Sequence, residues 1–429
     1  MVRSSAVDRL VDLLGDWSGG SGPLYRQLAR AVAVAVARGE LPGRARLPSE
    51  RALASAIAVS RGVVVAAYDE LEADGTIERR RGSGTFVAVG AATALPSGRE
   101  GSALVGRLAS TGDRPEVIDL SLSVLLEPEG LPDASIHLAA LAAEGPDGPA
   151  GSTALRTRIA ERLGGIGLAT TVDQVVVTTG AQQAIAVAIG CWVRPGDLVV
   201  VDDPTYPGVL PALAAAGAEV VGVPVDRDGI RLGPLRDALD RGPALAYLQS
   251  GPHSPTGGRL SDHRRRAVAA EVVERRIPVV EDVALFALDW SGGREVPPLA
   301  AHAPDHPVAL VGSYAKRFWS GLRVGFVRAP APLAERFARV KAVSDLGSSA
   351  VGQAMALALL DHPSHEEAVA ARNATLAARA ELLATLVRQR LDGWEADVPD
   401  GGLSLWVRLP RPVAARFAEV VLRHGVAVA

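Results

Sequence analysis

The stretch Val175-Val176-Val177-Thr178-Thr179-Gly180-Ala181-Gln182-Gln183-Ala184 decides the fold of most of the chain. Its first half predicts a buried strand, because the run is apolar and carries no charge. Its second half begins a helix that we expect to run from Ala181 to Val193. The turn between them places a helix N-terminus directly after a strand, where backbone N–H groups favour a phosphate. On its own this evidence is weak, since many strand–helix turns contain glycine.

The same alternation of strand and helix continues along the chain. Further apolar runs are typical of buried strands, and helical patterns separate several of them. The predicted strands are 198–201, 219–223, 245–248, 278–281 and 308–312, and the predicted helices include 207–216 and 261–275. This alternation predicts the α/β class, with a mostly parallel sheet and helices on both faces. Ligands of such folds bind beyond the carboxyl ends of the strands.

Chemically useful side chains come just after the ends of three predicted strands. Each has an ordinary alternative role: a tyrosine can pack a loop, a carboxylate can cap a helix, and an arginine can be a surface charge. However, an aromatic ring, a carboxylate, a hydroxyl, an amine and a guanidinium at one edge of a sheet favour a shared ligand. In chain order these residues are Tyr206, Asp282, Ser313, Lys316 and Arg323.

Lysine is almost absent from the chain. Of 45 lysine and arginine residues only two, Lys316 and Lys341, are lysines. Arginine fills most electrostatic roles, but its guanidinium stays protonated and cannot condense with an aldehyde, whereas a lysine amine can. Lys316 is therefore a candidate for a Schiff base, although an ordinary surface lysine remains the alternative. Lys341 fits that alternative well.

Length and composition limit the class of protein. The 429 residues predict two or three domains, and 48% hydrophobic residues can build a large core. The sequence contains no charge-free apolar run of about 20 residues, so no membrane span is predicted. The N-terminus lacks a signal-peptide core. The single cysteine, Cys191, cannot form an internal disulfide, which suits a reducing cytoplasm. The net charge of −3 does not indicate a nucleic-acid binder, so DNA contact requires a local basic face.

The first 90 residues form a different pattern. A helix is predicted over 23–39, a short helix capped by Ser49 reaches about Ile57, and a helix over 61–73 begins after Ser60. Two short strands over 76–87 then enclose a basic tip. Three helices and a basic β-wing predict a winged helix whose last helix enters the major groove of DNA. The alternative is a small helical oligomerisation module.

These residues resemble the DNA-binding domain of the GntR family of bacterial regulators. The matching runs are Leu47-Pro48-Ser49-Glu50-Arg51, Val59-Ser60-Arg61, Ala67-Tyr68-Asp69-Glu70-Leu71 and Arg81-Gly82-Ser83-Gly84-Thr85. After Arg61 the helix continues with Gly62-Val63-Val64-Val65, where the family often has Thr and Arg, so modest base selectivity is expected. The resemblance implies DNA contacts by Arg46, Ser49, Arg51, Ser60, Arg61, Arg81 and Gly82.

The order of groups after the strands resembles that of the fold-type-I pyridoxal-phosphate (PLP) enzymes of the aminotransferase class. Together with the winged helix, the whole chain resembles the MocR subfamily of transcription regulators. The resemblance implies that Lys316 forms a Schiff base with PLP, that Asp282 pairs with the pyridine nitrogen, and that Tyr206 stacks on the ring. The cofactor-binding set that it implies is Gly180, Ala181, Gln182, Tyr206, Ser254, Asp282, Ser313, Lys316 and Arg323. No metal site is predicted.

The resemblance is incomplete in three places. Ser254 stands where the family often has asparagine, and Ala284 and Leu285 stand where it commonly has a tyrosine. In the family, that asparagine and that tyrosine normally contact the phenolic oxygen of the cofactor. Without them, we expect the Schiff base to be more basic than in a working aminotransferase. The sequence ends at Ala429, before the family's arginine for a substrate carboxylate, so we expect either that the sequence is incomplete or that the C-terminal small domain is truncated.

The predicted organisation is a winged-helix domain over 1–88, a flexible linker over 89–116 and an aminotransferase-like domain over 117–429. The favoured hypothesis is a cytoplasmic, homodimeric regulator that binds paired DNA half-sites and senses PLP or an amine. One alternative is a PLP-dependent aminotransferase with an accessory winged helix. Another is a regulator whose C-terminal domain serves only for dimerisation.

Overall fold

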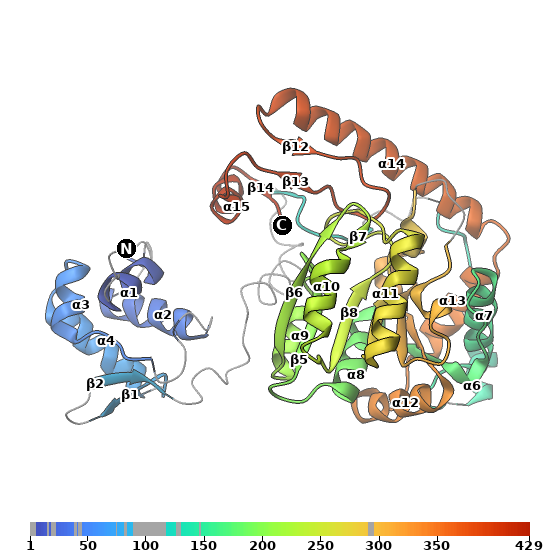
Figure 1. Cartoon of the computed structure of the whole chain (residues 1–429), viewed down its shortest axis with the longest axis horizontal. Coiled ribbons are helices and arrows are strands. Elements are labelled where there is room, and N and C mark those ends of the chain that lie inside the picture. Colours follow the sequence, from blue (N-terminus) through green and yellow to red (C-terminus); the bar gives the residue numbers. More distant parts are fainter. Residues whose placement is uncertain are drawn as a thin grey trace. The chain divides into compact units, whose positions relative to one another are not determined.

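The computed structural model describes residues 6–14, 17–18, 23–37, 41, 45–73, 75–80, 84–88, 117–125, 130–145, 147–290 and 296–429. The chain divides into two compact units, Met1–Gly106 and Arg107–Ala429 (Figure 1). The predicted linker over 89–116 lies outside the described residues, as do Arg81 and Gly82 of the predicted wing tip.

The N-terminal unit is a winged helix, as predicted. Its helices are α1 (Ala6–Leu14), α2 (Leu24–Ala37), α3 (Glu50–Ala56) and α4 (Arg61–Ala73), and its wing pairs β1 (Ile77–Arg80) antiparallel with β2 (Gly84–Val87). Helix α4 packs into the core of this unit through Val64, Tyr68 and Leu71, which are fully buried. The Tyr68 hydroxyl donates a hydrogen bond to the carbonyl of Pro48 at 3.0 Å, which fastens α4 to the start of α3. Helix α1 was not predicted.

The C-terminal unit is built on one eight-stranded sheet with the strand order β4-β11-β10-β9-β8-β5-β6-β7. Strands β4, β5, β6, β8, β9 and β10 run in one direction, while β11 and β7 pair antiparallel with their neighbours. The mostly parallel sheet is thus confirmed. The strand bounds are β4 (Val175–Thr178), β5 (Leu198–Asp203), β6 (Glu219–Asp226), β7 (Gly229–Ile230), β8 (Leu245–Gln249), β9 (Val279–Asp282), β10 (Val308–Ser313) and β11 (Gly325–Arg328).

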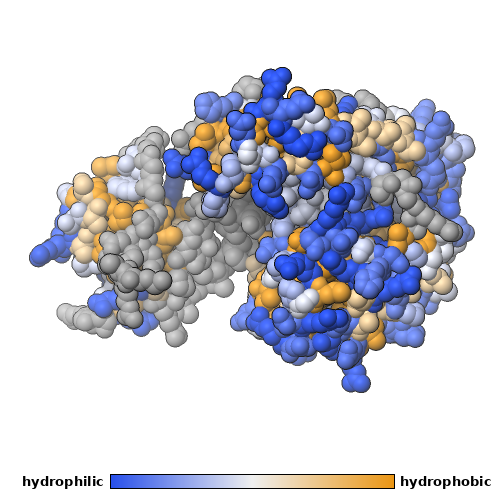
Figure 2. All heavy atoms as spheres, turned by 45° about the horizontal axis from the view of Figure 1, so that its top comes forward, coloured by the Kyte–Doolittle hydropathy of each residue, from blue (hydrophilic) through white to orange (hydrophobic). Residues whose placement is uncertain are grey.

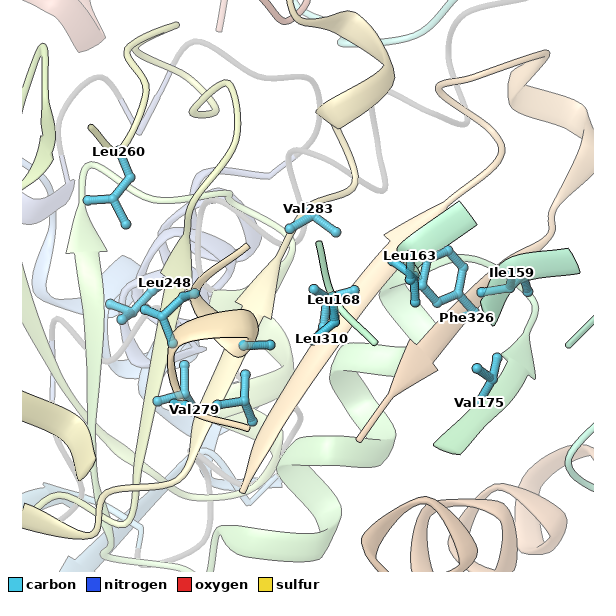
Figure 3. Packing of buried hydrophobic residues seen from close by; sticks show 14 of the residues in the cluster. Ile159, Leu163, Leu168, Val175, Leu248, Leu260, Val279, Val283, Leu310 and Phe326 are labelled. Atoms are coloured by element: carbon cyan, nitrogen blue, oxygen red, sulfur yellow. The ribbon is translucent and has the colours of Figure 1, made fainter. Parts of the chain in front are cut away.

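Helices cover both faces of this sheet, because two separate apolar clusters form on it. One cluster takes in α7 (Thr153–Gly165), α10 (Leu232–Leu239), α11 (Asp262–Arg275) and α13 (Ala350–Asp361). Figure 3 shows part of it, with Leu163 of α7 close to Phe326 of β11. The other cluster takes in α8 (Ala181–Trp192), α9 (Val209–Ala215) and α12 (Ala331–Asp345). Helix α6 (Leu138–Glu144) contacts α13.

The remaining C-terminal elements form a smaller layer beside the sheet (Figure 1). They are α14 (His365–Arg390), β12 (Glu395–Ala396), β13 (Val407–Arg408), α15 (Ala414–Arg423) and β14 (Val426–Ala427), which pairs parallel with β3 (Ile118–Asp119). Ahead of β13, Gly401 forms an isolated antiparallel bridge with Asp289. Gly401 lies against Leu288 and Pro252 so tightly that a Cβ there would stand 2.3 Å from the Leu288 carbonyl oxygen.

Among the described residues, no helix combines the length and the apolarity that a membrane crossing requires. Hydrophilic residues cover much of the surface in the view of Figure 2, and hydrophobic residues lie between them in smaller patches.

Candidate functional site

The candidate cofactor site lies at the carboxyl ends of adjacent parallel strands. Asp282 is the last residue of β9 and Ser313 the last of β10, and these strands pair side by side. Lys316 follows β10 by three residues, and Gly180 connects β4 to α8. The sheet therefore brings together groups that are more than 100 residues apart in the chain, as the strand pattern predicted.

The Asp282 carboxylate is held from two sides in a buried position. The hydroxyl of Tyr247, on β8, donates to Oδ2 at 2.5 Å, and the backbone N–H of Ala284 donates to Oδ1 at 2.8 Å. Burial raises the pKa of Asp282, and these two hydrogen bonds counteract the rise only in part. Tyr247 was missed in the sequence. Its signal was a hydroxyl in the middle of an otherwise apolar strand.

The Lys316 amine is half-buried and donates a hydrogen bond to the carbonyl of Ser123. Burial and the positive charge of Arg323 lower the pKa of Lys316 to about 8, while the Asp282 carboxylate opposes the shift. A lysine with this pKa has far more free amine near neutral pH than an ordinary lysine, and the free amine is the nucleophilic form.

The turn between β4 and α8 is compressed so that only glycine fits. Gly180 is the N-cap of α8 with φ of 118°, and a Cβ on it would lie 3.3 Å from Nη2 of Arg323. A Cβ on Gly325 would lie 2.8 Å from the Cα of Gly180. Arg323 is exposed and takes part in none of the ion pairs formed by the described residues. A guanidinium beside the N-terminus of α8, where Ala181 and Gln182 present backbone N–H groups, suits a phosphate dianion.

Tyr206 is held in place by Gln182. Its hydroxyl donates to Oε1 of Gln182 at 3.1 Å, and Nε2 of Gln182 donates to the carbonyl of Gly208 at 2.7 Å. The ring packs over Gly208, where a Cβ would come within 2.5 Å of ring atoms. Burial and the Asp282 charge raise the pKa of Tyr206 to about 12, against the opposite effect of Arg323. The Gln182 side chain thus holds Tyr206 in place, and the backbone N–H of Gln182 remains for a phosphate.

The two serines of the predicted set occupy different environments. The Ser313 hydroxyl accepts a hydrogen bond from the N–H of Ala315 at 3.2 Å, within the segment that carries Lys316. The backbone of Ser254 is bound on both sides by the Gln249 side chain, each hydrogen bond being 2.9 Å long. Asp202 and His253, both buried, approach each other to 3.6 Å behind Gln249. This pair was also missed.

Lys341 contradicts its interpretation as a surface lysine. Its side chain is fully buried in α12, where Nζ lies 3.0 Å from the Asp345 carboxylate. The interpretation was wrong because a lysine one helical turn before an aspartate can be neutralised inside the protein.

The candidate DNA contacts on the N-terminal unit lie at exposed positions. Arg46, Ser49, Arg51, Ser60 and Arg61 are all exposed, and the predicted cap is confirmed because the Ser49 hydroxyl accepts from the N–H of Ala52. The ion pairs among the described residues involve neither Arg51 nor Arg61. Both guanidiniums are thus available to phosphates.

Comparison with known proteins matches each unit to one family. Residues 24–87 match the gntR family of bacterial regulatory proteins, and residues 142–429 match aminotransferase class I and II. The probable rhizopine catabolism regulatory protein MocR of Rhizobium meliloti is 29% identical over 91% of this chain and 82% of its own length. The HTH-type pyridoxine biosynthesis transcriptional regulator PdxR of Corynebacterium glutamicum is 30% identical over 74% of this chain and 68% of its own length.

A solved structure extends the comparison to three dimensions. The α-aminoadipate aminotransferase LysN from Thermus thermophilus, complexed with N-(5'-phosphopyridoxyl)-L-leucine, superimposes with a TM-score of 0.64 at 26% identity. The superposition covers 75% of this chain and 85% of LysN. A winged helix joined to this fold defines a transcription regulator with an aminotransferase-like domain. The chain belongs to the MocR subfamily of GntR-family regulators, and its larger domain to aminotransferase class I and II.

Proposed function

We propose that this regulator binds PLP in its aminotransferase-like domain and changes its DNA binding in response to PLP or an amine. The observation that carries the proposal is the environment of Lys316. One of only two lysines in the chain has a pKa lowered to about 8 beside a buried carboxylate and an exposed arginine that forms no ion pair with the described residues. An amine, a carboxylate and a guanidinium in this order match the aldehyde, the ring nitrogen and the phosphate of PLP.

Each residue of the proposed site has a definite task. Arg323, Ser313 and the N–H groups of Ala181 and Gln182 would bind the phosphate. Asp282 would hold a proton on the pyridine nitrogen, with Tyr247 keeping the carboxylate oriented. When bound, PLP supplies an aldehyde that reacts with amines and a ring that withdraws electrons.

Other features support further parts of the proposal. Tyr206 is proposed to cover one face of the ring, and Ser254 to contact its edge. The DNA-binding set comprises Arg46, Ser49, Arg51, Ser60, Arg61, Arg81 and Gly82. We assign residues 1–88 to the DNA-binding domain, 89–116 to the linker and 117–429 to the sensor, in a protein of the cytoplasm.

A regulator that reads paired half-sites is proposed to act as a homodimer. Val343 and Leu346, near the C-terminal end of α12, have 90% and 83% of their surface exposed. Apolar side chains this exposed on adjacent turns support a partner surface. A ligand can switch such a dimer only if it binds one arrangement more tightly, by a few kcal/mol, than the other.

The proposal can be tested by chemical labelling, because the chain contains only two lysines that PLP could modify. Purified protein is incubated with PLP, reduced with borohydride and digested, and the phosphopyridoxyl label is located by mass spectrometry. We expect one label per chain on the Lys316 peptide, none on the Lys341 peptide, and no label in Lys316→Ala. The same proteins are tested for binding to genomic DNA fragments with and without PLP. Labelling at other amines alone, or DNA binding that PLP leaves unchanged, would contradict the proposal.

A further inference from the structure

The second lysine of the chain stands behind the turn that leads into α8. Lys341 is fully buried, and its Nζ lies 3.0 Å from Oδ2 of Asp345 and 3.3 Å from the carbonyl of Pro149. A buried ammonium is tolerated only when a counter-charge and hydrogen bonds replace its water shell. Asp345 supplies that charge, one helical turn further along α12.

Lys341, Asp345, Gln183 and the backbone of Thr179 form a series of hydrogen-bonded groups that leads to the turn. Oδ2 of Asp345 accepts a hydrogen bond from Nε2 of Gln183 at 2.8 Å, and Oε1 of Gln183 accepts from the backbone N–H of Thr179 at 2.9 Å. A carboxylate only accepts, so it fixes which end of the Gln183 amide faces it. The other end, the carbonyl oxygen, is thereby directed at Thr179.

We propose that Lys341, Asp345 and Gln183 are positioning residues that set the turn Thr179–Gly180 for the phosphate of PLP. With its N–H held by Gln183, Thr179 cannot turn this group outward, and the free N–H groups of Ala181 and Gln182 remain in register with Arg323. None of the three side chains needs to touch the cofactor. This inference rests on the proposed function, because it concerns the same PLP site.

Arginine would not replace Lys341 easily. The lysine is fully enclosed and bonds to one carboxylate and one carbonyl, while a guanidinium is larger and brings five donors that would all need partners. Both lysines that the chain retains would then serve one site, Lys316 at the aldehyde and Lys341 behind the phosphate.

The test separates the phosphate from the rest of the cofactor by comparing PLP with pyridoxal, which lacks it. Dissociation constants of both are measured for wild type, Lys341→Met, Gln183→Leu and the double variant. We expect each single variant to weaken PLP about tenfold and pyridoxal less than twofold. The double variant should lose little more than either single one, because the residues act in series.

A matched control is Arg336→Met on the same helix. The Arg336 guanidinium donates to the carbonyl of Cys191 at 2.6 Å and lies outside the series, so its loss should leave the ratio of the two constants unchanged. Hydrogen exchange without any cofactor adds an independent readout: peptides containing Thr179 should exchange faster in Lys341→Met and Gln183→Leu than in Arg336→Met. If Lys341→Met does not fold, Gln183→Leu carries both measurements.

The outcomes are distinguishable. If wild type binds PLP at Lys316 but the variants weaken PLP and pyridoxal equally, or weaken neither, the positioning role is refuted and the proposed function stands. If wild type does not bind PLP at all, the proposed function fails and this inference with it.

Discussion

The Lys316 amine is expected to react with aldehydes at a lower pH than ordinary lysines do. Burial and Arg323 lower its pKa to about 8 from the usual value near 10.5. Only the uncharged amine attacks an aldehyde, so the rate of capture should rise with pH and reach half its maximum near pH 8. Pyridoxal is the suitable probe, because its binding does not require Arg323 to hold a phosphate. The rate is followed by absorbance between pH 6 and 11.

The control for this prediction is Arg323→Gln. Removing the nearby positive charge should move the midpoint to higher pH, while burial keeps it below that of a free lysine. A wild-type midpoint close to 10 would show that the amine is not perturbed.

Tyr247 is expected to matter through Asp282. Its hydrogen bond favours the charged carboxylate, so Tyr247→Phe should raise the pKa of Asp282 further. The protonated acid pairs poorly with a pyridinium, so PLP affinity should fall about tenfold at pH 6.5 and less at pH 8.5. Titration with PLP at both pH values measures this. Tyr68→Phe removes another buried hydroxyl, in the winged helix, and should leave PLP affinity unchanged; an equal loss in both variants would contradict the prediction.

At the scale of elements, local pattern predicted most strands of the large sheet but not their partners, and it left helices such as α7, α12, α13 and α14 unassigned. The valine run of β4 and the cap at Ser49 are local signals, and the structure confirms the elements that they mark. Strand β11 was missed because it is only four residues long and carries no period of its own. Its place between β4 and β10 is fixed by pairing with both.

For the candidate site too, local pattern indicates which residues follow the strands but not which side chains they contact. Residues at strand ends could be predicted to meet, because all parallel strands end at one edge. The roles of Tyr247 and Lys341 could not be assigned, because they depend on side chains that are close only in space. Tyr247 contacts Asp282. Lys341 is connected through Asp345 to Gln183. The burial of Lys341 could not be predicted in particular, because its partner Asp345 is one aspartate among many in the sequence.

The N-terminus of α4 is expected to bind DNA mainly through phosphates. Arg61 begins this helix, Arg51 lies on α3, and both are exposed without an ion pair among the described residues. Each arginine that contacts a phosphate releases counterions, so Arg51→Ala and Arg61→Ala should each reduce the slope of log affinity against log salt by about 0.9. Fluorescence anisotropy with a labelled duplex at several salt concentrations measures the slope.

Arg26→Ala is the matched control for these variants. Arg26 is also exposed but pairs at 3.8 Å with Glu70, near the C-terminal end of α4. Its removal should leave the slope unchanged. If all three variants change the slope equally, the DNA contact is not confined to α3 and α4.

At the scale of the whole molecule, we expect the response to PLP to require a dimer in which each protomer fixes the position of the other. A carboxylate at Val343 or Leu346 would have to be buried against the partner without a counter-charge, which is costly. We therefore expect Leu346→Glu and Val343→Glu to raise the dimer dissociation constant by about tenfold or more. Light scattering coupled to size exclusion measures the mass. Leu382→Glu, on the exposed side of α14, is the control and should remain dimeric.

The monomeric variants should also lose the response to PLP without losing PLP itself. Each domain would still fold and bind its own ligand, but a single winged helix gains nothing from a change in the distance between two half-sites. DNA affinity should therefore fall toward that of one half-site and become independent of PLP, while borohydride labelling of Lys316 persists. If Leu346→Glu is monomeric and its DNA binding still changes with PLP, the signal passes within one chain, and the dimer is not the element that PLP switches.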